Sequence, residues 1–174
     1  MKSTLIDAGP LIALFDKDDK YHEKIKEFLK EYHGRLYTSW PVITEVLHML
    51  DFNVEVQIDF LKWIRKGALN AVSLTKESIT RIINLSRKYL DVPMDFSDAT
   101  LIVISETKNI KEIISIDADL YNFFIYIYIE MLEMNICKMC SNINKNLRLF
   151  RGLYRYNKYP DTSEFQVMLH GIAN

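Results

Sequence analysis

Short apolar runs alternate with longer amphipathic segments over roughly the first 120 residues of the chain. In the longer segments, apolar side chains recur every three or four positions, which is typical of helices, whereas the short runs are typical of buried strands. The expected strands span residues 3–6, 36–39, 68–74 and 113–116. The expected helices span residues 11–15, 20–32, 41–50, 55–65 and 76–89, and a last one begins after Asp95 or Ser97 and ends near residue 107. This alternation predicts an α/β fold.

Beyond residue 120 the pattern weakens. Residues 121–129 are dense in aromatic and β-branched side chains and predict an edge or final strand. Residues 131–174 are polar, rich in Asn, Tyr and Arg, and only weakly periodic. We therefore expect an organised domain over residues 1–121 and a C-terminal extension over residues 122–174.

Composition places the chain among ordinary globular proteins, with 49% hydrophobic and 26% charged residues. The net charge of −1 creates no global field toward nucleic acid or membranes, so any attraction to RNA has to come from local patches and metal ions. Asp7 interrupts the apolar N-terminus, no small-residue cleavage pattern follows, and the run at residues 123–129 is too short to span a bilayer. A soluble, cytoplasmic protein with no membrane partner is expected.

Four acidic residues stand where an α/β protein builds sites. Asp7 and Asp117 each follow a predicted strand at its carboxyl end, and Glu45 and Asp98 lie in predicted helices whose other residues are mostly apolar. Buried acids are costly unless a cation or hydrogen bonds compensate them. If the four converge, Mg²⁺ or Mn²⁺, which prefer oxygen ligands, would relieve their repulsion.

Each acid also has a plainer interpretation. Asp7 could cap the helix that follows it, and Asp95 or Asp98 could cap theirs. Glu45 could face solvent, and Asp117 and its neighbour Asp119 could be turn residues. The metal-site hypothesis rests on the set of acids in this order, because no single member is specific.

Four segments in this order resemble the PIN domain family, and within it the VapC-like toxins of type II toxin–antitoxin systems. They are LIDAGPLIALFDKDDKYHE, TSWPVITEVLHML, RKYLDVPMDFSDATLIVISE and IISIDADL, and the resemblance spans about residues 3–121. It implies a three-layer α/β/α sandwich around a central parallel sheet. It also implies an endoribonuclease that hydrolyses RNA phosphodiester bonds with Mg²⁺ or Mn²⁺.

The resemblance carries roles to individual positions. The family's four acids match Asp7, Glu45, Asp98 and Asp117, and Ser115 stands where the family has a hydroxyl near the metal. Asp7, Asp98 and Asp117 are then the expected metal ligands, and Glu45 either orients or deprotonates the attacking water or binds a second ion.

Accessory acids shared by many relatives match two further positions. These are Asp95 and Asp119, ranked below the main four. For the toxin interpretation, the resemblance further implies a cognate antitoxin and a homodimer.

Two other sequence features are weaker evidence for a function. Cys137 and Cys140 form a single CxxC without the partners of a zinc or thioredoxin-like site, so two incidental thiols are expected. Between residues 134 and 160, six basic residues are interleaved with tyrosines and no acid is present, which would suit contact with single-stranded RNA or a solvated tail. Family members usually end before this region.

Three alternatives stay open at this point. A haloacid-dehalogenase phosphatase would use the DxD formed by Asp117 and Asp119, but that motif belongs near the N-terminus of a chain and lacks its following residues here. A catalytically silent PIN module would have no reason to keep four costly carboxylates. A housekeeping RNA-processing nuclease would share the chemistry and differ from a toxin in lacking a neighbouring antitoxin.

Overall fold

A parallel four-stranded sheet forms the centre of the computed structural model, which describes residues 2–90 and 94–116. The strands are β1 (Ser3–Ile6), β2 (Arg35–Ser39), β3 (Asn70–Val72) and β4 (Ile113–Ile114), in the spatial order β3-β2-β1-β4. Leu5 of β1 lies between Tyr37 of β2 and Ile113 of β4 in the register. Because every pairing is parallel, the carboxyl ends of all four strands meet at one edge.

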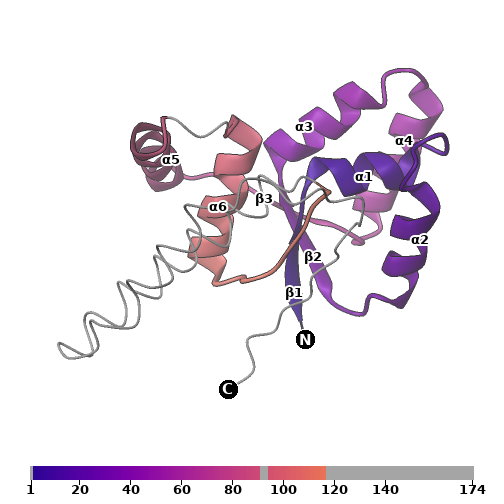
Figure 1. Cartoon of the computed structure of the whole chain (residues 1–174), viewed down its shortest axis with the longest axis horizontal. Coiled ribbons are helices and arrows are strands. Elements are labelled where there is room, and N and C mark those ends of the chain that lie inside the picture. Colours follow the sequence, from indigo (N-terminus) through magenta and orange to yellow (C-terminus); the bar gives the residue numbers. More distant parts are fainter. Residues whose placement is uncertain (1, 91–93, 117–174) are drawn as a thin grey trace, which may run out of the picture.

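Helices cover both faces of this sheet. They are α1 (Ala8–Phe15), α2 (His22–Glu31), α3 (Trp40–Met49), α4 (Val54–Arg65), α5 (Lys76–Lys88) and α6 (Phe96–Lys108). Figure 1 shows α5 and α6 on one side of the sheet and α1, α2 and α4 on the other. The expected α/β fold and its three-layer sandwich are confirmed.

On one face of the sheet the core lies where α6 packs against the strands, most closely against β2. Leu5 and Ile6 of β1 are fully buried. Leu101, Ile102 and Ile104 of α6 are also buried, so the central turns of this helix are almost wholly inside the protein. On the other side, the Phe15 ring at the end of α1 packs edge-on against Phe60 of α4, with ring centroids 5.2 Å apart. Aromatic pairs in this arrangement add to the free energy gained by burial alone.

Several predicted boundaries were wrong by two residues or more. The strand expected over residues 68–74 is β3, which covers only Asn70–Val72. Two further differences lie near the carboxyl edge of the sheet. α1 begins at Ala8, three residues before the predicted start, because Asp7 caps it and Pro10 falls in the first turn, where a missing N–H breaks no helical bond. β4 ends at Ile114 instead of residue 116, and the Ser115 hydroxyl donates a hydrogen bond to the Asp7 carboxylate.

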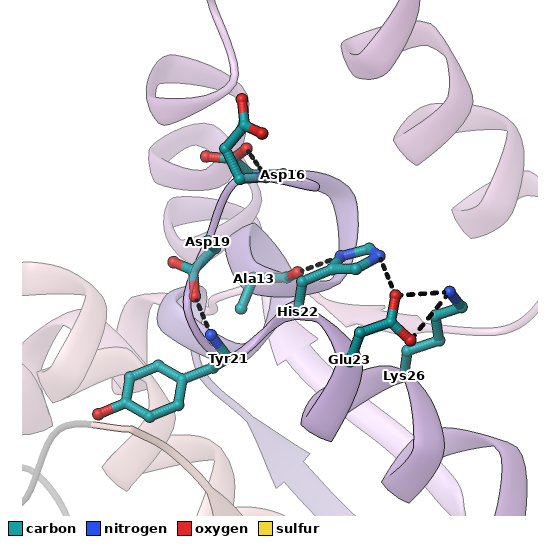
Figure 2. A network of polar contacts seen from close by, with 8 residues as sticks. Ala13, Asp16, Asp19, Tyr21, His22, Glu23 and Lys26 are labelled. Carbon is teal, nitrogen blue, oxygen red and sulfur yellow. Dashed lines mark hydrogen bonds and ion pairs between the residues drawn. The ribbon is translucent and has the colours of Figure 1, made fainter.

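The turn between α1 and α2 is fixed by polar contacts (Figure 2). His22 Nδ1 lies 2.9 Å from the carbonyl oxygen of Ala13, so Nδ1 carries the proton and satisfies a carbonyl in the last turn of α1. Asp19 accepts a hydrogen bond from the backbone N–H of Tyr21 at 2.7 Å, a typical Asx turn. The hydrogen bond from Lys26 holds the pKa of exposed Glu23 below its ordinary value. His22 therefore has a structural role.

Several predictions concern residues outside the described part of the chain. They are the strand at residues 121–129, the extension over residues 122–174, the CxxC thiols and the basic, tyrosine-rich region. Within the part that is described, no helix has the length and hydropathy needed to cross a membrane.

Candidate active site

Asp7 directly follows the carboxyl end of β1, one of the two inner strands of the sheet. Its backbone N–H donates to the carbonyl of Ile114 at 3.0 Å, which extends the pairing with β4 up to the acid. Its Oδ1 accepts from the backbone N–H of Ala8 at 2.6 Å and so caps α1. The residue is 8% exposed, so this carboxylate at the sheet edge is nearly buried. The capping interpretation is confirmed, and it leaves the second oxygen for other partners.

That second oxygen is held by the residue that follows β4. Ser115 Oγ donates to Asp7 Oδ2 at 2.9 Å. Ile116 packs against the first turn of α1, where an added Cβ on Gly9 would come within 3.0 Å of its Cγ1. Glycine at this position therefore lets the chain leaving β4 lie directly over the residues next to Asp7.

Glu45 and the start of α6 form the second part of the site. Ser97 Oγ donates to Glu45 Oε2 at 2.7 Å, across 52 positions of sequence. Both residues are half-buried, so Glu45 does not simply face solvent as one alternative held. His48, one turn further along α3, is exposed.

A buried hydroxyl pair reinforces this contact between α3 and α6. Thr100 Oγ1 lies 2.6 Å from the carbonyl of Ser97 and 2.7 Å from Ser39 Oγ, and Ser39 and Thr100 are both fully buried. The Thr100 hydroxyl is the donor in both contacts, so its single proton is shared between the Ser97 carbonyl and Ser39 Oγ. Ser39 in turn caps α3 by accepting from Val42 N–H at 3.3 Å. Two hydrogen bonds thus join the N-terminal part of α6 to α3, one at the N-cap Ser39 and one at Glu45.

Asp98 and Asp95 form a capping box at the start of α6. Asp98 N–H donates to Asp95 Oδ1 at 2.9 Å, and Asp95 N–H donates to Asp98 Oδ2 at 3.2 Å. Asp95 is the N-cap, which decides between the two caps expected from the sequence, and it is exposed. Asp98 is half-buried and directly follows Ser97 in the first turn of α6.

These contacts thus place the predicted acids in two separate groups. Asp7 is bonded to Ser115, and Glu45 is bonded to the start of α6. Within residues 2–90 and 94–116 no group of three or more acidic, histidine or cysteine side chains is close enough to hold a metal ion. Asp117 and Asp119 lie outside the described residues. The oxygens present are of the kind that Mg²⁺ and Mn²⁺ prefer.

Sequence reasoning missed three hydroxyl residues of this region, Ser39, Ser97 and Thr100. The sequence contains a partial signal for two of them. Ser97 and Thr100 are three positions apart in the first turn of a helix, so they lie on one face of it. Nothing in the sequence shows that this face meets α3.

Fold and site together define an α/β protein that places acidic side chains at the carboxyl edge of a parallel sheet, within α3 and at the start of α6. A family model described as PIN domain matches residues 4–123. This is well over half of the 174 residues, and the chain belongs to the PIN domain family.

A solved structure with a similar fold is that of Mycobacterium tuberculosis VapC20, described as a sarcin-ricin loop cleaving toxin. The TM-score is 0.62 at 18% sequence identity, and the match covers 68% of this chain and 93% of the VapC20 chain. At this identity the likeness shows the fold alone. A comparison with curated proteins gives no significant match.

Proposed function

We propose that the chain is a divalent-metal-dependent endoribonuclease that hydrolyses RNA phosphodiester bonds. The observation that carries the proposal is the fixed position of Asp7, a nearly buried carboxylate held by Ser115 at the carboxyl edge of the sheet. Membership of the PIN domain family supports the same reaction class. In parallel α/β sheets this edge is where ligands bind.

Asp117 completes the proposed metal site. Ser115 bonds to Asp7 and Ile116 packs on Gly9, so the two residues that precede Asp117 both lie against the start of α1. Asp117 directly follows these two residues in the sequence, and we propose it as a further ligand on that ground. Asp7, Asp98 and Asp117 would hold Mg²⁺ or Mn²⁺, and Asp95 and Asp119 are secondary candidates.

The bound ion would supply charge stabilisation and an activated water. The chain's own residues set the geometry around it. Ser115 fixes the orientation of the Asp7 carboxylate, and Ser97 fixes one oxygen of Glu45. Glu45 is then the candidate to orient or deprotonate the attacking water, because its carboxylate is held in place from α6 and is only half-buried.

The biological setting we propose is that of a cytoplasmic toxin that is neutralised by a cognate antitoxin. Its support is the fold shared with VapC20, a protein described as a toxin that cleaves the sarcin-ricin loop. An antitoxin would act by covering the carboxyl edge of the sheet around Asp7. For the chain itself, we propose that the nuclease domain ends near residue 121.

Mapping of RNA ends tests the proposed reaction. Total RNA from cells in which the full chain is briefly expressed should contain new 5′ ends that are missing from cells expressing the Glu45→Gln variant to the same level. Equal sets of ends in the two samples would contradict the proposal. A purified mixture of the chain and a single candidate RNA should then reproduce the mapped cuts.

Removal of divalent metal is expected to stop RNA cleavage by the purified protein. EDTA in excess should abolish activity, and dialysis into Mg²⁺ or Mn²⁺ should restore it, because no charge other than the metal's offsets phosphate repulsion by the carboxylates in the proposed mechanism. The measurement is the initial rate on a labelled RNA, with Ca²⁺ dialysis as a control for general ionic effects. Cleavage that persists in EDTA would contradict the metal assignment.

Ser97→Ala is expected to lower the cleavage rate about tenfold, the lower end of the effect of losing a residue that orients a ligand or base. The change frees Glu45 Oε2 from its 2.7 Å hydrogen bond while leaving the Thr100 contact to the Ser97 backbone intact. The loss should fall on kcat more than on KM, and Ser97→Thr should recover most of the rate. A change in KM alone would contradict the positioning role.

A further inference from the structure

Two half-exposed aromatic rings lie at the junction of α3 and α6. Trp40 is the first residue of α3 and Phe96 is the first residue of α6, and they are 51% and 52% exposed. The residues around them are much less exposed, since Ser39 and Ala99 are almost completely buried. Large apolar rings that stay in contact with water next to a polar site are candidates for ligand contacts.

Hydrogen bonds between the two helices fix where these rings lie. Ser39, directly before Trp40, is bonded to the first turns of α6 over 2.7 Å. Ser97, directly after Phe96, is bonded to Glu45 of α3 over 2.7 Å. Both ring residues are therefore neighbours in sequence of residues that join α3 to α6. The candidate catalytic carboxylate of Glu45 belongs to the same junction.

The backbone under both rings is held in place by helix caps. Trp40 lies between Ser39, the N-cap of α3, and Pro41, whose ring restricts the backbone of the first turn. Phe96 lies inside the capping box that opens α6. An aromatic side chain has only two rotatable bonds, so a ring on a fixed backbone loses little conformational entropy when a ligand packs against it.

We propose that Trp40 and Phe96 stack on unpaired bases of the RNA strand beside the phosphate that is cleaved. This inference rests on the proposed nuclease function and adds the residues that hold its substrate. The carboxylates of Glu45, Asp95 and Asp98 at this junction repel a phosphate backbone, and the net charge of the chain is −1. Stacking supplies an attraction that does not depend on charge, because every base has a flat π face.

Tryptophan fluorescence tests the contact at Trp40 directly. The chain has two tryptophans, and the second, Trp63 of α4, packs edge-on against Phe15 with ring centroids 5.8 Å apart. Trp63→Phe therefore leaves Trp40 as the one indole, and Trp40→Phe leaves Trp63. Both are made in the full chain carrying Glu45→Gln, so that the RNA stays intact.

Single-stranded oligoadenylate of about ten nucleotides should quench the indole at position 40 and leave the indole at position 63 unchanged. The same strand paired with oligouridylate should need an at least tenfold higher concentration, because its bases are already stacked and paired. Unchanged fluorescence of Trp40 at saturating single-stranded RNA would overturn the proposal and leave a protein partner as the occupant of the rings. Equal quenching by the duplex would overturn it as well.

Steady-state cleavage tests both rings. Trp40→Leu and Phe96→Leu should each raise KM about tenfold and leave kcat nearly unchanged, because a stacked base is held in the bound state and during the reaction alike. Trp40→Tyr and Phe96→Tyr keep a ring and should keep most of the affinity. The matched control is Phe52→Leu, which removes a ring that is 59% exposed in the turn after α3 and should leave KM unchanged. Circular dichroism checks that each variant is folded.

The two measurements separate this inference from the proposed function. A wild type that cleaves RNA, beside leucine variants with unaltered KM, would refute the stacking role and leave the nuclease assignment standing. Quenching of Trp40 by single-stranded RNA in a chain whose wild type cleaves no RNA would support the stacking role and refute the nuclease assignment.

Discussion

Asp7→Asn is expected to lower RNA cleavage by a factor on the order of 10² to 10³ or more, comparable to the loss of a group that stabilises charge in a transition state. The substitution removes the negative charge at the centre of the proposed metal site. It keeps the shape and the hydrogen bonds, because an amide oxygen accepts from the N–H of Ala8 as a carboxylate does and the amide group can bond to Ser115. The measurement is the single-turnover cleavage rate at saturating Mg²⁺.

The Asp7→Asn variant should lose activity without losing stability. Asparagine is as good an N-cap as aspartate, so the thermal unfolding midpoint should stay close to that of the wild type or rise, because repulsion among acids is relieved in the metal-free protein. Asp18→Asn, the same change in an exposed loop acid, is the matched control and should keep full activity. A fully active Asp7→Asn protein would remove Asp7 from the metal site.

The position of Asp7 and of Glu45 could be predicted from the sequence because both depend on local patterns. A short apolar run followed by an acid predicts a buried strand with a carboxylate at its end, and β1 has those bounds. The periodicity after Ser39 likewise predicts a helix with Pro41 in its first turn, and α3 begins at Trp40. Parallel pairing follows once helices separate successive strands, whereas the strand order β3-β2-β1-β4 was not predicted.

The contacts that orient these acids could not be predicted in the same way. Glu45 and Ser97 are 52 positions apart in the sequence, and Asp7 and Ser115 are 108 apart. The spacing of residues within one helix or strand therefore cannot reveal either contact. The end of β4 was also missed, because Ile113 to Ile116 looks like one apolar run with a serine in it. In the folded chain that serine belongs to the site and not to the strand. Asp117, the fourth acid, stays a prediction.

Asp98 has two possible functions in the folded chain, and they predict different results for two substitutions. As a member of the capping box, its carboxylate accepts from Asp95 N–H and stabilises the first turn of α6. As a metal ligand in the proposed site, it would contribute negative charge at the start of α6. The capping role needs only an acceptor oxygen, whereas the metal-binding role needs the charge.

Asp98→Asn keeps the acceptor and loses the charge, and Asp98→Ala loses both. We expect both variants to lose cleavage by a similar factor, on the order of 10² or more, because the charge is missing from each. Only the alanine variant should lose stability, by about 1 kcal/mol for one hydrogen bond at a helix start. Cleavage rates and urea unfolding of the two proteins, measured side by side, separate the roles. An asparagine variant that cleaves RNA at the wild-type rate beside an impaired alanine variant would mean that Asp98 acts through the helix alone, and the proposed site would then depend on Asp7, Glu45 and Asp117.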